Sequence, residues 1–556
     1  MKCTVREGKS CAAAIAQKKV AKTATKPLIR LIIISRLLDT EVLIVGAGPV
    51  GLVLAIDLGQ KGVRCTLIER KPAPQFLPKM ERCNARTMEI FRRMGIATSV
   101  RAAGLRADVP MDVYIITAMN QPPLLRHQYP SAAEARAQID ACTDGTMPLE
   151  PYQLISQYTL EPLLKSVAET LPSVTVRYGC EFLSFSQDSV SVTAQTSAGP
   201  IRSQYLVGCD GGASAVRQQL GIALNGEGDL LRLWQGLFHC EELFDRIPIN
   251  NGPGRGRHYH VADERSTFLI MQDSTRHWTL HAQLDDERAM ARQFEKTIGV
   301  PVKYEMLYVG EWKQNLLLAG RYGSGRVFLA GDAVHLMIPT GGLGMNSGVG
   351  DAIDLGWKLA ATLQGWGGPK LLASYEAERC PVGERNVAAS RYASQGRRKW
   401  RGLWRNLDEL VAVAEVEQRK SNEMIGAELG YRYAGSPIVA DEPGGPDDDF
   451  RQYIPTSWPG ARLPHVWLDG HTAIQDRIGR GYTLLRLGNS RLNTSGLEEA
   501  MKALGAPFDA LDVPDPIARE IYGFDLILLR PDLHVAWRDN RGPADPARLA
   551  ALVTGH

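Results

Sequence analysis

Cysteine is scarce in this chain, and long hydrophobic runs are missing. The nine cysteines stand at irregular spacings, none follows Cys380, and no CxxC pair or zinc-ligand pattern occurs. This pattern argues against a secreted disulfide framework and offers no metal site, so we expect reduced thiols in the cytoplasm. The apolar stretch at 28–38 is broken by Arg30 and Arg36 and is far shorter than the roughly 20 residues of a membrane-spanning helix.

Positive charge is concentrated at the N-terminus and is not in excess elsewhere. Residues 1–40 carry nine Lys or Arg and two acidic residues, a local +7, which leaves a net charge of −4 for the rest of the chain. A mildly acidic body gives no reason to expect nucleic-acid binding, and we expect no stable membrane association. We interpret residues 1–39 as a disordered basic extension, with a targeting leader or a membrane-surface helix as the alternative.

The order of apolar and polar segments indicates several α/β domains. A length of 556 residues predicts two to four domains. Residues 40–45 and 63–69 are typical of buried parallel strands, and the helix expected at 49–61 completes a βαβ unit. Residues 106–150 suggest an inserted irregular loop, and residues 174–207 suggest an antiparallel ribbon. The Pro-, Gly- and Asp-rich stretch 435–449 predicts a linker before a C-terminal α/β unit.

A glycine-rich turn stands between the first expected strand and helix. It has the GxGxxG pattern, in which Gly46 permits a tight turn, Gly48 lets the backbone approach a pyrophosphate and Gly51 allows close packing. The start of the helix then offers free N–H groups to the phosphates. Glu69 ends the second strand, where an acid can accept hydrogen bonds from ribose hydroxyls, and Arg70 follows it.

Two later motifs make the dinucleotide more specific. They are Asp210-Gly-Gly-Ala-Ser214-Ala-Val-Arg217 and Gly331-Asp332-Ala-Val-His335, the second followed by Pro339 and Gly341-Gly-Leu-Gly344-Met345-Asn346. Taken alone, the first motif could merely cap a helix. In this order, the three motifs resemble those of the FAD-dependent aromatic hydroxylases, the group A flavoprotein monooxygenases built like para-hydroxybenzoate hydroxylase and phenol hydroxylase. The resemblance covers about residues 40–390.

The resemblance implies a set of FAD contacts. Asp332 and Gln157 would contact the ribityl chain, Arg82 would lie near the pyrophosphate, and Pro339 would lie beside the isoalloxazine ring. Asp210 would serve FAD and a visiting nicotinamide cofactor. Backbone N–H groups of Gly344, Met345 and Asn346 would face the flavin pyrimidine edge, where negative charge develops on reduction. His335 has two interpretations, a neighbour of the flavin or a hydrogen-bonded structural histidine.

The resemblance also implies the fold class: α/β, with a Rossmann-like FAD-binding domain, a mixed-sheet substrate domain and a C-terminal thioredoxin-like α/β domain. The expected boundaries are 40–110 with 151–222 and 323–395 for the FAD domain, 111–150 with 223–322 for the substrate domain, 396–457 for a helical segment and linker, and 458–556 for the last domain. Because that last domain has no cysteine, disulfide exchange is excluded, and structural support or homodimer contacts are left.

The implied activity is oxidation of NADPH or NADH, capture of O2 as a flavin C4a-hydroperoxide and transfer of one oxygen atom to a phenolic ring. No second GxGxxG domain is evident, which fits transient use of the nicotinamide cofactor. We expect catabolism of a simple, halo- or nitro-substituted phenol or catechol. The alternatives are a tailoring hydroxylase of a polyketide or other secondary metabolite and a non-catalytic FAD-binding regulator.

The residues that would ionise the phenol are less well defined. His258, Tyr259 and His260 lie in a strand-like run, where alternation sends two of them to one face and the third to the other. A surface or core role is the alternative. Glu81 stands where phenol hydroxylase has a catalytic acid, although a solvated loop glutamate is the plainer interpretation. Phe268, Ile270 and Trp278 are candidates to line the pocket, or else to form core.

Overall fold

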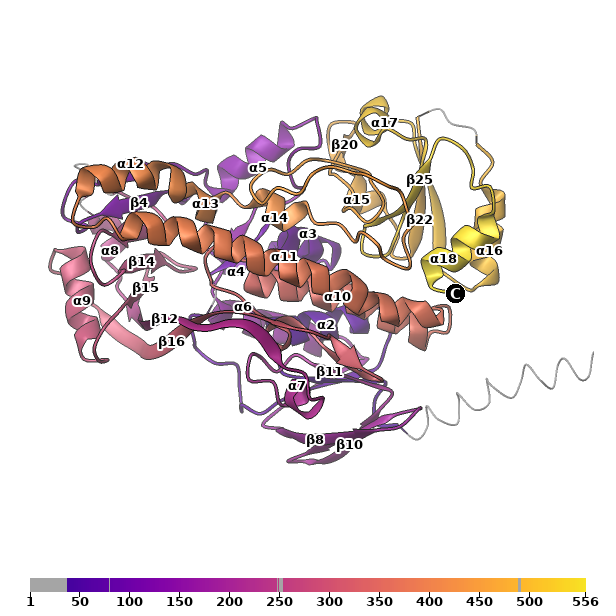
Figure 1. Cartoon of the computed structure of the whole chain (residues 1–556), viewed down its shortest axis with the longest axis horizontal. Helices are drawn as coiled ribbons and strands as arrows, with labels where there is room; N and C mark the ends of the chain where they lie inside the picture. The colour runs from indigo at the N-terminus through magenta and orange to yellow at the C-terminus, as the bar shows by residue number, and fades with distance from the viewer. Residues whose placement is uncertain (1–37, 80, 248, 250–253, 489–491) are drawn as a thin grey trace, which may run out of the picture.

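The computed structural model describes residues 38–79, 81–247, 249, 254–488 and 492–556. The interpretation of the basic extension therefore falls almost wholly outside the described residues. The fold is mixed α/β, as predicted, and Figure 1 shows one sheet in the predicted FAD-binding domain, a second large sheet and a C-terminal domain joined by long helices.

A six-stranded sheet contains the glycine-rich turn. Its strand order is β17-β18-β11-β1-β2-β7. These strands are Gly323–Ser324, Val327–Leu329, Tyr205–Gly208, Val42–Val45, Cys65–Glu69 and Val174–Tyr178, in that order. All neighbours pair in parallel except β17 with β18. The four residues of β1 are apolar and buried, since helices cover both faces of such a sheet. Helix α2 (Pro49–Gln60) packs there against helix α10 (Gly344–Leu363).

The antiparallel ribbon expected over residues 174–207 is only partly right. A separate antiparallel sheet is formed by β8 (Phe182–Gln187), β9 (Val192–Thr196) and β10 (Gly199–Ser203). The flanking strands β7 and β11 belong instead to the parallel sheet. Short alternating runs do not reveal this difference, because the partners of β7 and β11 are more than 100 residues away in sequence.

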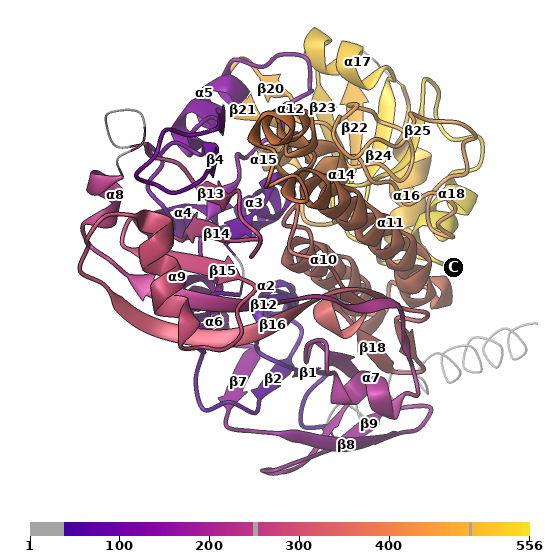
Figure 2. The same ribbon diagram turned by 60° about the vertical axis from the view of Figure 1, so that its left-hand side comes forward.

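An eight-stranded sheet lies in the predicted substrate domain, in the order β19-β16-β12-β15-β14-β13-β4-β5. Its strands are His335–Leu336, Glu305–Ala319, Leu224–His239, His277–Ala282, Phe268–Met271, His258–Val261, Val113–Ile116 and Leu125–His127. The long strands β12 and β16 sweep from this domain towards the FAD sheet (Figure 2). Residues 106–150 were expected to be irregular, but they supply β4, β5 and helix α5 (Ala132–Asp140), so that expectation was wrong.

A 33-residue helix, α11 (Pro369–Arg401), runs across the molecule from the C-terminal domain to the substrate sheet (Figure 1). Helix α12 (Leu407–Glu417) then packs back against it. The other α-helices outside the C-terminal domain are α3 (Ala85–Arg93), α4 (Ala97–Ala103), α6 (Gln157–Glu169), α7 (Ala215–Gln219), α8 (Leu243–Arg246), α9 (Ala289–Ile298), α13 (Arg419–Asn422) and α14 (Ile425–Leu429). A short ladder pairs β3 (Arg82–Cys83) with β6 (Gln153–Leu154).

The C-terminal domain has the thioredoxin arrangement. Its sheet order is β23-β22-β24-β25, with β22 parallel to β23 and antiparallel to β24. The elements are β22 (Tyr482–Leu487), α16 (Ser495–Ala503), β23 (Phe508–Val513), α17 (Pro516–Tyr522), β24 (Leu526–Leu529), β25 (Val535–Asp539) and α18 (Pro546–Thr554). Before them come β20 (Trp467–Leu468), β21 (Thr472–Ala473) and α15 (Ile474–Arg477).

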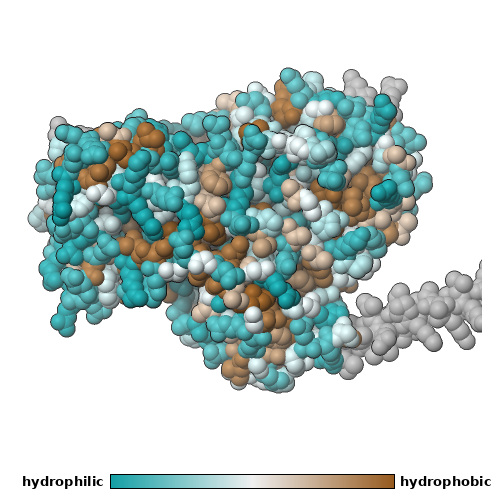
Figure 3. All heavy atoms as spheres, viewed as in Figure 1, coloured by the Kyte–Doolittle hydropathy of each residue, from teal (hydrophilic) through white to brown (hydrophobic). Residues whose placement is uncertain are grey.

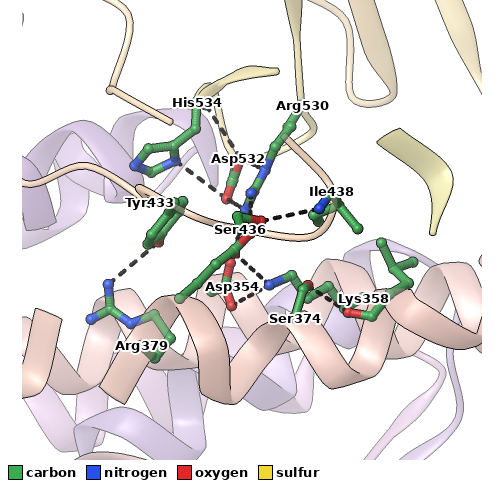
Figure 4. A network of polar contacts seen from close by, with 12 residues as sticks. Asp354, Lys358, Ser374, Arg379, Tyr433, Ser436, Ile438, Arg530, Asp532 and His534 are labelled. Atoms are coloured by element: carbon green, nitrogen blue, oxygen red, sulfur yellow. Dashed lines mark hydrogen bonds and ion pairs between the residues drawn. The ribbon is translucent and has the colours of Figure 1, made fainter. Parts of the chain in front are cut away.

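A buried charge network joins this domain to helices α10 and α11 (Figure 4). Arg530 contacts Asp354 at 2.9 Å, Glu378 at 2.6 Å and Asp532 at 2.6 Å. Lys358 contacts the first two of these acids at 2.7 and 2.6 Å. Charges this deeply buried are tolerated only when paired and hydrogen-bonded, so the domain is attached through matched partners.

The surface carries no continuous apolar belt on the face shown in Figure 3, where hydrophilic side chains surround small apolar groups. None of the helices in the described ranges is both long and apolar enough to span a membrane.

Candidate active site

The glycine-rich turn has the geometry that a dinucleotide requires. Gly46 has φ +106°, and a Cβ there would lie 2.4 Å from the carbonyl oxygen of Cys209. A Cβ on Gly51 would lie 2.0 Å from the carbonyl oxygen of Gly46. A Cβ on Gly48 would instead meet only Glu161 Oε1, at 4.0 Å. The open side of Gly48 faces the start of α2, which has no side-chain cap, so pyrophosphate can approach the free N–H groups.

Three further predicted cofactor residues surround this turn. Glu69 accepts hydrogen bonds from the backbone N–H of Ala47 at 3.1 Å and of Lys71 at 2.9 Å, so it braces the turn. Arg70, next to it, is exposed. Gln157 begins α6 and donates to Glu161 Oε1 at 2.6 Å, on the open side of Gly48.

The two aspartate turns lie side by side. Arg217 joins them, because its Nη1 donates to the carbonyl oxygens of Gly212 at 2.9 Å and Ala333 at 3.1 Å. Asp210 accepts from the N–H of Val216 at 3.2 Å, while its Oδ1 is buried without a partner among the described residues. Burial raises the pKa of Asp210. A buried acceptor without a donor fits a site that a hydroxyl of bound FAD would complete.

Asp332 and Pro339 are both solvent-exposed in this turn. Protein nevertheless surrounds the carboxyl group of Asp332, and this burial raises its pKa against the effects of His335 and Lys79. A Cβ on Gly331 or on Gly348 would meet Val50 at 2.9 or 2.5 Å, so the first turns of α2 and α10 converge on the same place.

The start of α10 is held by the side chain of Asn346. Its Oδ1 accepts from the N–H of Asn84 at 2.9 Å, and its Nδ2 donates to the carbonyl oxygens of Arg82 at 3.1 Å and Gly342 at 2.6 Å. The helix begins at Gly344 with no side-chain cap, so the N–H groups of Gly344, Met345 and Asn346 are the ones left for a ligand. The side chain of Asn346 therefore positions the loop, and its backbone is free to bind.

Arg82 contacts the same loop from the opposite side. Its Nη2 donates to the carbonyl oxygen of Gly341 at 2.9 Å and to Glu428 Oε1 at 3.1 Å, while its Nε is buried without a partner among the described residues. Glu428, on α14, was not predicted, and burial raises its pKa despite Arg82. Because Glu428 is 346 residues from Arg82, no local pattern could have paired them.

A second unpredicted residue, Asp351, organises the glycine–aspartate turn from α10. It accepts hydrogen bonds from the N–H of Gly331 at 3.0 Å, from His335 Nε2 at 2.8 Å and from Arg379 Nε at 2.8 Å. The buried His335 is thus hydrogen-bonded within the fold. Arg379 and His335 outweigh burial and hold the pKa of Asp351 below its usual range. The available signal was the presence of two acidic residues, Asp351 and Asp354, at buried positions of α10.

Glu81 and His258 meet on the substrate side. Glu81 pairs with Arg257 and with His258, whose Nε2 lies 3.1 Å from both carboxylate oxygens. Burial favours the neutral acid, but Arg257 and His258 outweigh it and hold the pKa of Glu81 well below its usual range. Burial lowers the pKa of His258 to about 4 although Glu81 opposes it. His258 is therefore neutral near pH 7, and Arg257 is the cation that keeps Glu81 ionised.

The tautomer of His258 follows from this pairing. An ionised carboxylate only accepts hydrogen bonds, so Nε2 carries the proton and Nδ1 presents a lone pair. That Nδ1 is buried and has no partner in the described part of the chain. His258 thus offers an acceptor, held in place by Glu81, to a group that the protein itself does not supply.

The other sequence candidates divide between the two faces of the sheet. Strand pairing places His260, Phe268, Ile270 and His281 on the face of His258. Burial lowers the pKa of His260 well below its usual range and that of His281 to about 3. Tyr259 lies on the opposite face, fully buried in the core, with its hydroxyl bonded to the backbone of Gly254 and Gly256. Trp278 is in the same core, so the structure brings neither of these residues to His258.

Comparisons with known proteins identify the family of this chain. The family model "FAD binding domain" matches residues 39–390, and "Aromatic-ring hydroxylase, C-terminal" matches residues 456–555. The chain is 31% identical to the FAD-dependent monooxygenase apdD of Emericella nidulans, over 92% of this chain and 90% of that protein. It is 34% identical to aklavinone 12-hydroxylase RdmE of Streptomyces purpurascens, over 92% and 96%. It is 32% identical to a 4-methyl-5-nitrocatechol 5-monooxygenase of a Burkholderia species, over 92% and 96%.

Solved structures give the same result. The rebeccamycin biosynthetic enzyme RebC with reduced flavin superposes with a TM-score of 0.84 at 31% identity, over 93% of this chain and 99% of that one. A ternary complex of aklavinone-11 hydroxylase with FAD and aklavinone superposes with a TM-score of 0.79 at 30% identity, over 93% and 99%.

The chain belongs to the family of FAD-dependent aromatic-ring monooxygenases. The enzyme class and the FAD cofactor expected from the motifs are confirmed. The individual roles given to the site residues, and the domain boundaries, stay predictions.

Proposed function

We propose that the enzyme uses NAD(P)H and O2 to hydroxylate a phenolic ring that donates a hydrogen bond to Nδ1 of His258. The observation that carries this proposal is a continuous connection between the loop predicted to bind the flavin and the residues around His258. Arg82 contacts the flavin-binding loop at Gly341, and the preceding residue, Glu81, holds His258. Consecutive residues therefore fix both the cofactor loop and the acceptor for the substrate.

FAD would be held by the uncapped starts of α2 and α10, with Asp210, Asp332 and Arg82 around it. When bound, it supplies reduction by NAD(P)H and activation of O2. The protein's part is to bind the ring, orient its hydroxyl and favour the ionised form, which reacts faster with electrophilic oxygen. His258 orients the hydroxyl, while the surrounding arginines stabilise the phenolate.

The acceptor is weak as a base, because a histidine with a pKa of about 4 takes up a proton reluctantly. The ionised phenol is therefore favoured mainly by nearby positive charge, and His258 sets the direction of the O–H bond. A site that orients the hydroxyl but does not strongly deprotonate it suits a phenol that is already acidic, such as one conjugated to a quinone or a nitro group.

We favour a polycyclic phenol of polyketide type as the substrate, because RdmE and several other relatives bear names of polyketide or aklavinone hydroxylases. A small phenol or catechol of a catabolic route is the second candidate. It is supported by the nitrocatechol monooxygenase, which matches over a similar length.

Turnover of purified FAD-loaded protein tests the proposal. Anthraquinone-type phenols and nitrocatechols would each be supplied with NADH or NADPH, and O2 uptake and a product one oxygen heavier would be measured. We expect equal consumption of NAD(P)H and O2 and formation of hydroxylated product from one of the two classes. Ligand-stimulated NAD(P)H oxidation that yields only hydrogen peroxide with every phenol would contradict it.

A further inference from the structure

Two arginines of α11 lie over the apolar end of the substrate face. The guanidinium carbon of Arg397 is 5.9 Å from the ring centre of Phe268, and that of Arg401 is 5.1 Å from it. The two residues are four positions apart, so they lie on the same side of the helix. Phe268 shares its sheet face with His258, which places both arginines above the proposed substrate site.

Neither arginine is paired with an acid in the described parts of the chain. Arg397 has no hydrogen bond or ion pair there, and its Nε is buried without a partner. Arg401 donates to the carbonyl oxygen of Ser266 at 2.6 Å and to His260 Nδ1 at 3.0 Å. A guanidinium group that is partly buried is normally matched by a directly bonded carboxylate, and neither arginine of this pair has one among the described residues.

The charges around the substrate face do not balance. Three guanidinium groups, those of Arg257, Arg397 and Arg401, meet one carboxylate, Glu81, which is already paired with Arg257. Asp263 acts on Arg401 only electrostatically, and its carboxylate is bonded to Thr267. Burial lowers the pKa of Arg397 to about 10, and burial together with Arg397 lowers that of Arg401 to about 9. Glu81 raises the pKa of Arg397 and Asp263 raises that of Arg401, but neither acid is hydrogen-bonded to these arginines, and burial outweighs both.

We propose that Arg397 and Arg401 bind an acidic group carried by the aromatic substrate, so that the enzyme prefers phenols that are anions at neutral pH. This inference rests on the proposed function and specifies its substrate class. The acidic group is a carboxylate on the ring or a hydroxyl acidified by a nitro or quinone substituent. A planar guanidinium suits both, because it can bind two oxygens at once and lie flat against an aromatic ring.

Ligand binding to the FAD-loaded enzyme, followed by the change in flavin absorbance and without NAD(P)H, tests this. Two matched pairs would be used: 3-hydroxy-2-naphthoate with 2-naphthol, and 4-nitrocatechol with 4-methylcatechol. We expect the anion of at least one pair to bind about tenfold or more tighter than its neutral partner, the ratio of one charge-assisted contact. Preference in the naphthol pair identifies a carboxylate, and preference in the catechol pair identifies an ionised hydroxyl.

The variant R397Q should bring the preferred ratio close to one. R398Q is the matched control, because Arg398 lies on the same helix turn and its side chain is exposed. R397K keeps the charge but loses the planar guanidinium group, so it should retain part of the preference. It also provides a second variant in case R397Q folds poorly. Equal binding of both members of each pair to the wild type, or a preference that survives R397Q, would overturn the inference. Since binding is read without turnover, failed hydroxylation would count against the proposed function alone.

Discussion

At the scale of single residues, the glycines of the first turn have separable roles. Gly46 is required by the fold, because its φ of +106° and the nearby carbonyl of Cys209 leave no room for a side chain. Gly48 has φ −70° and ψ 177°, which alanine adopts freely, and its Cβ would find only Glu161 at 4.0 Å. The protein alone therefore gives no steric reason for glycine at position 48.

We accordingly expect G48A to fold like the wild type and to bind FAD roughly tenfold or more weakly, because a methyl group would stand where the pyrophosphate approaches. Equilibrium dialysis against FAD and a thermal melt of the apoprotein would measure the two effects. G46A is the contrasting variant and should lower the melting temperature sharply. If G48A binds FAD as tightly as the wild type, the pyrophosphate does not lie at this turn.

His258 allows a second prediction at this scale. H258Q should reduce kcat for an un-ionised phenol by about tenfold, the effect of losing one orienting hydrogen bond, and much less for 4-nitrocatechol, which is already acidic. Protonation of Nδ1 removes the acceptor, so activity of the wild type should persist on the acid side and fall only as the pH drops through about 4. Steady-state rates at several pH values would check both points.

Y259F is the control for that experiment. Its hydroxyl bonds only backbone atoms on the opposite face of the sheet, so the variant should be less stable by about 1–3 kcal/mol while kcat stays near the wild-type value. A loss of kcat in Y259F as large as that in H258Q would remove the case for His258.

At the scale of elements, helix α10 has its predicted cofactor contacts at its start and holds the neighbouring turn at Gly331 about two helical turns later, through Asp351. Asp351 accepts hydrogen bonds from Gly331 and His335 of the turn and from Arg379 of α11. D351N should destabilise the protein by about 3–5 kcal/mol, because it leaves Arg379 as an unpaired buried charge, and it should weaken FAD binding as well. Melting temperature and FAD content after gel filtration would be measured, with D408N, at an exposed position of α12, as control.

The sequence predicts much of the fold and site at this scale where the information is local. The three glycine-containing motifs, the strands beside them and helix α10 each depend on neighbouring residues. The pairing of Glu428 with Arg82 and the position of Arg397 above Phe268 depend on how distant helices pack. Periodicity marks a helix over 371–430 but does not tell which side of it meets the sheet, so these contacts could not be predicted.

At the scale of the whole molecule, the C-terminal domain acts through buried charges and has no thiol to react with. Arg530 lies among Asp354, Glu378 and Asp532 with none of its side chain exposed, and a second arginine of this domain, Arg462, is buried against Glu89 of α3. Removing the domain would leave buried acids on α3 and α10 without these arginine partners. We therefore regard it as part of the same cooperative structure as the FAD site.

R530M should lower stability by about 3–5 kcal/mol, since it leaves Asp354 and Glu378 to share Lys358 and leaves Asp532 without its arginine. Denaturant unfolding followed by flavin release would measure this. R486Q is the matched control, because Arg486 pairs with Asp512 in a partly exposed position within the domain and should cost less than about 1 kcal/mol. Equal losses in the two variants would show that the buried network does not attach the domain.

The short strand β3 limits the changes in sequence length that this segment can tolerate. Glu81 contacts His258 and Arg82 contacts the loop at Gly341, and the pairing of Arg82 with Leu154 fixes the side of the strand on which each lies. Slipping the strand by one residue would exchange the two side chains and reverse the charge presented to each compartment. An insertion or deletion in this segment should therefore abolish activity even if the chain still folds.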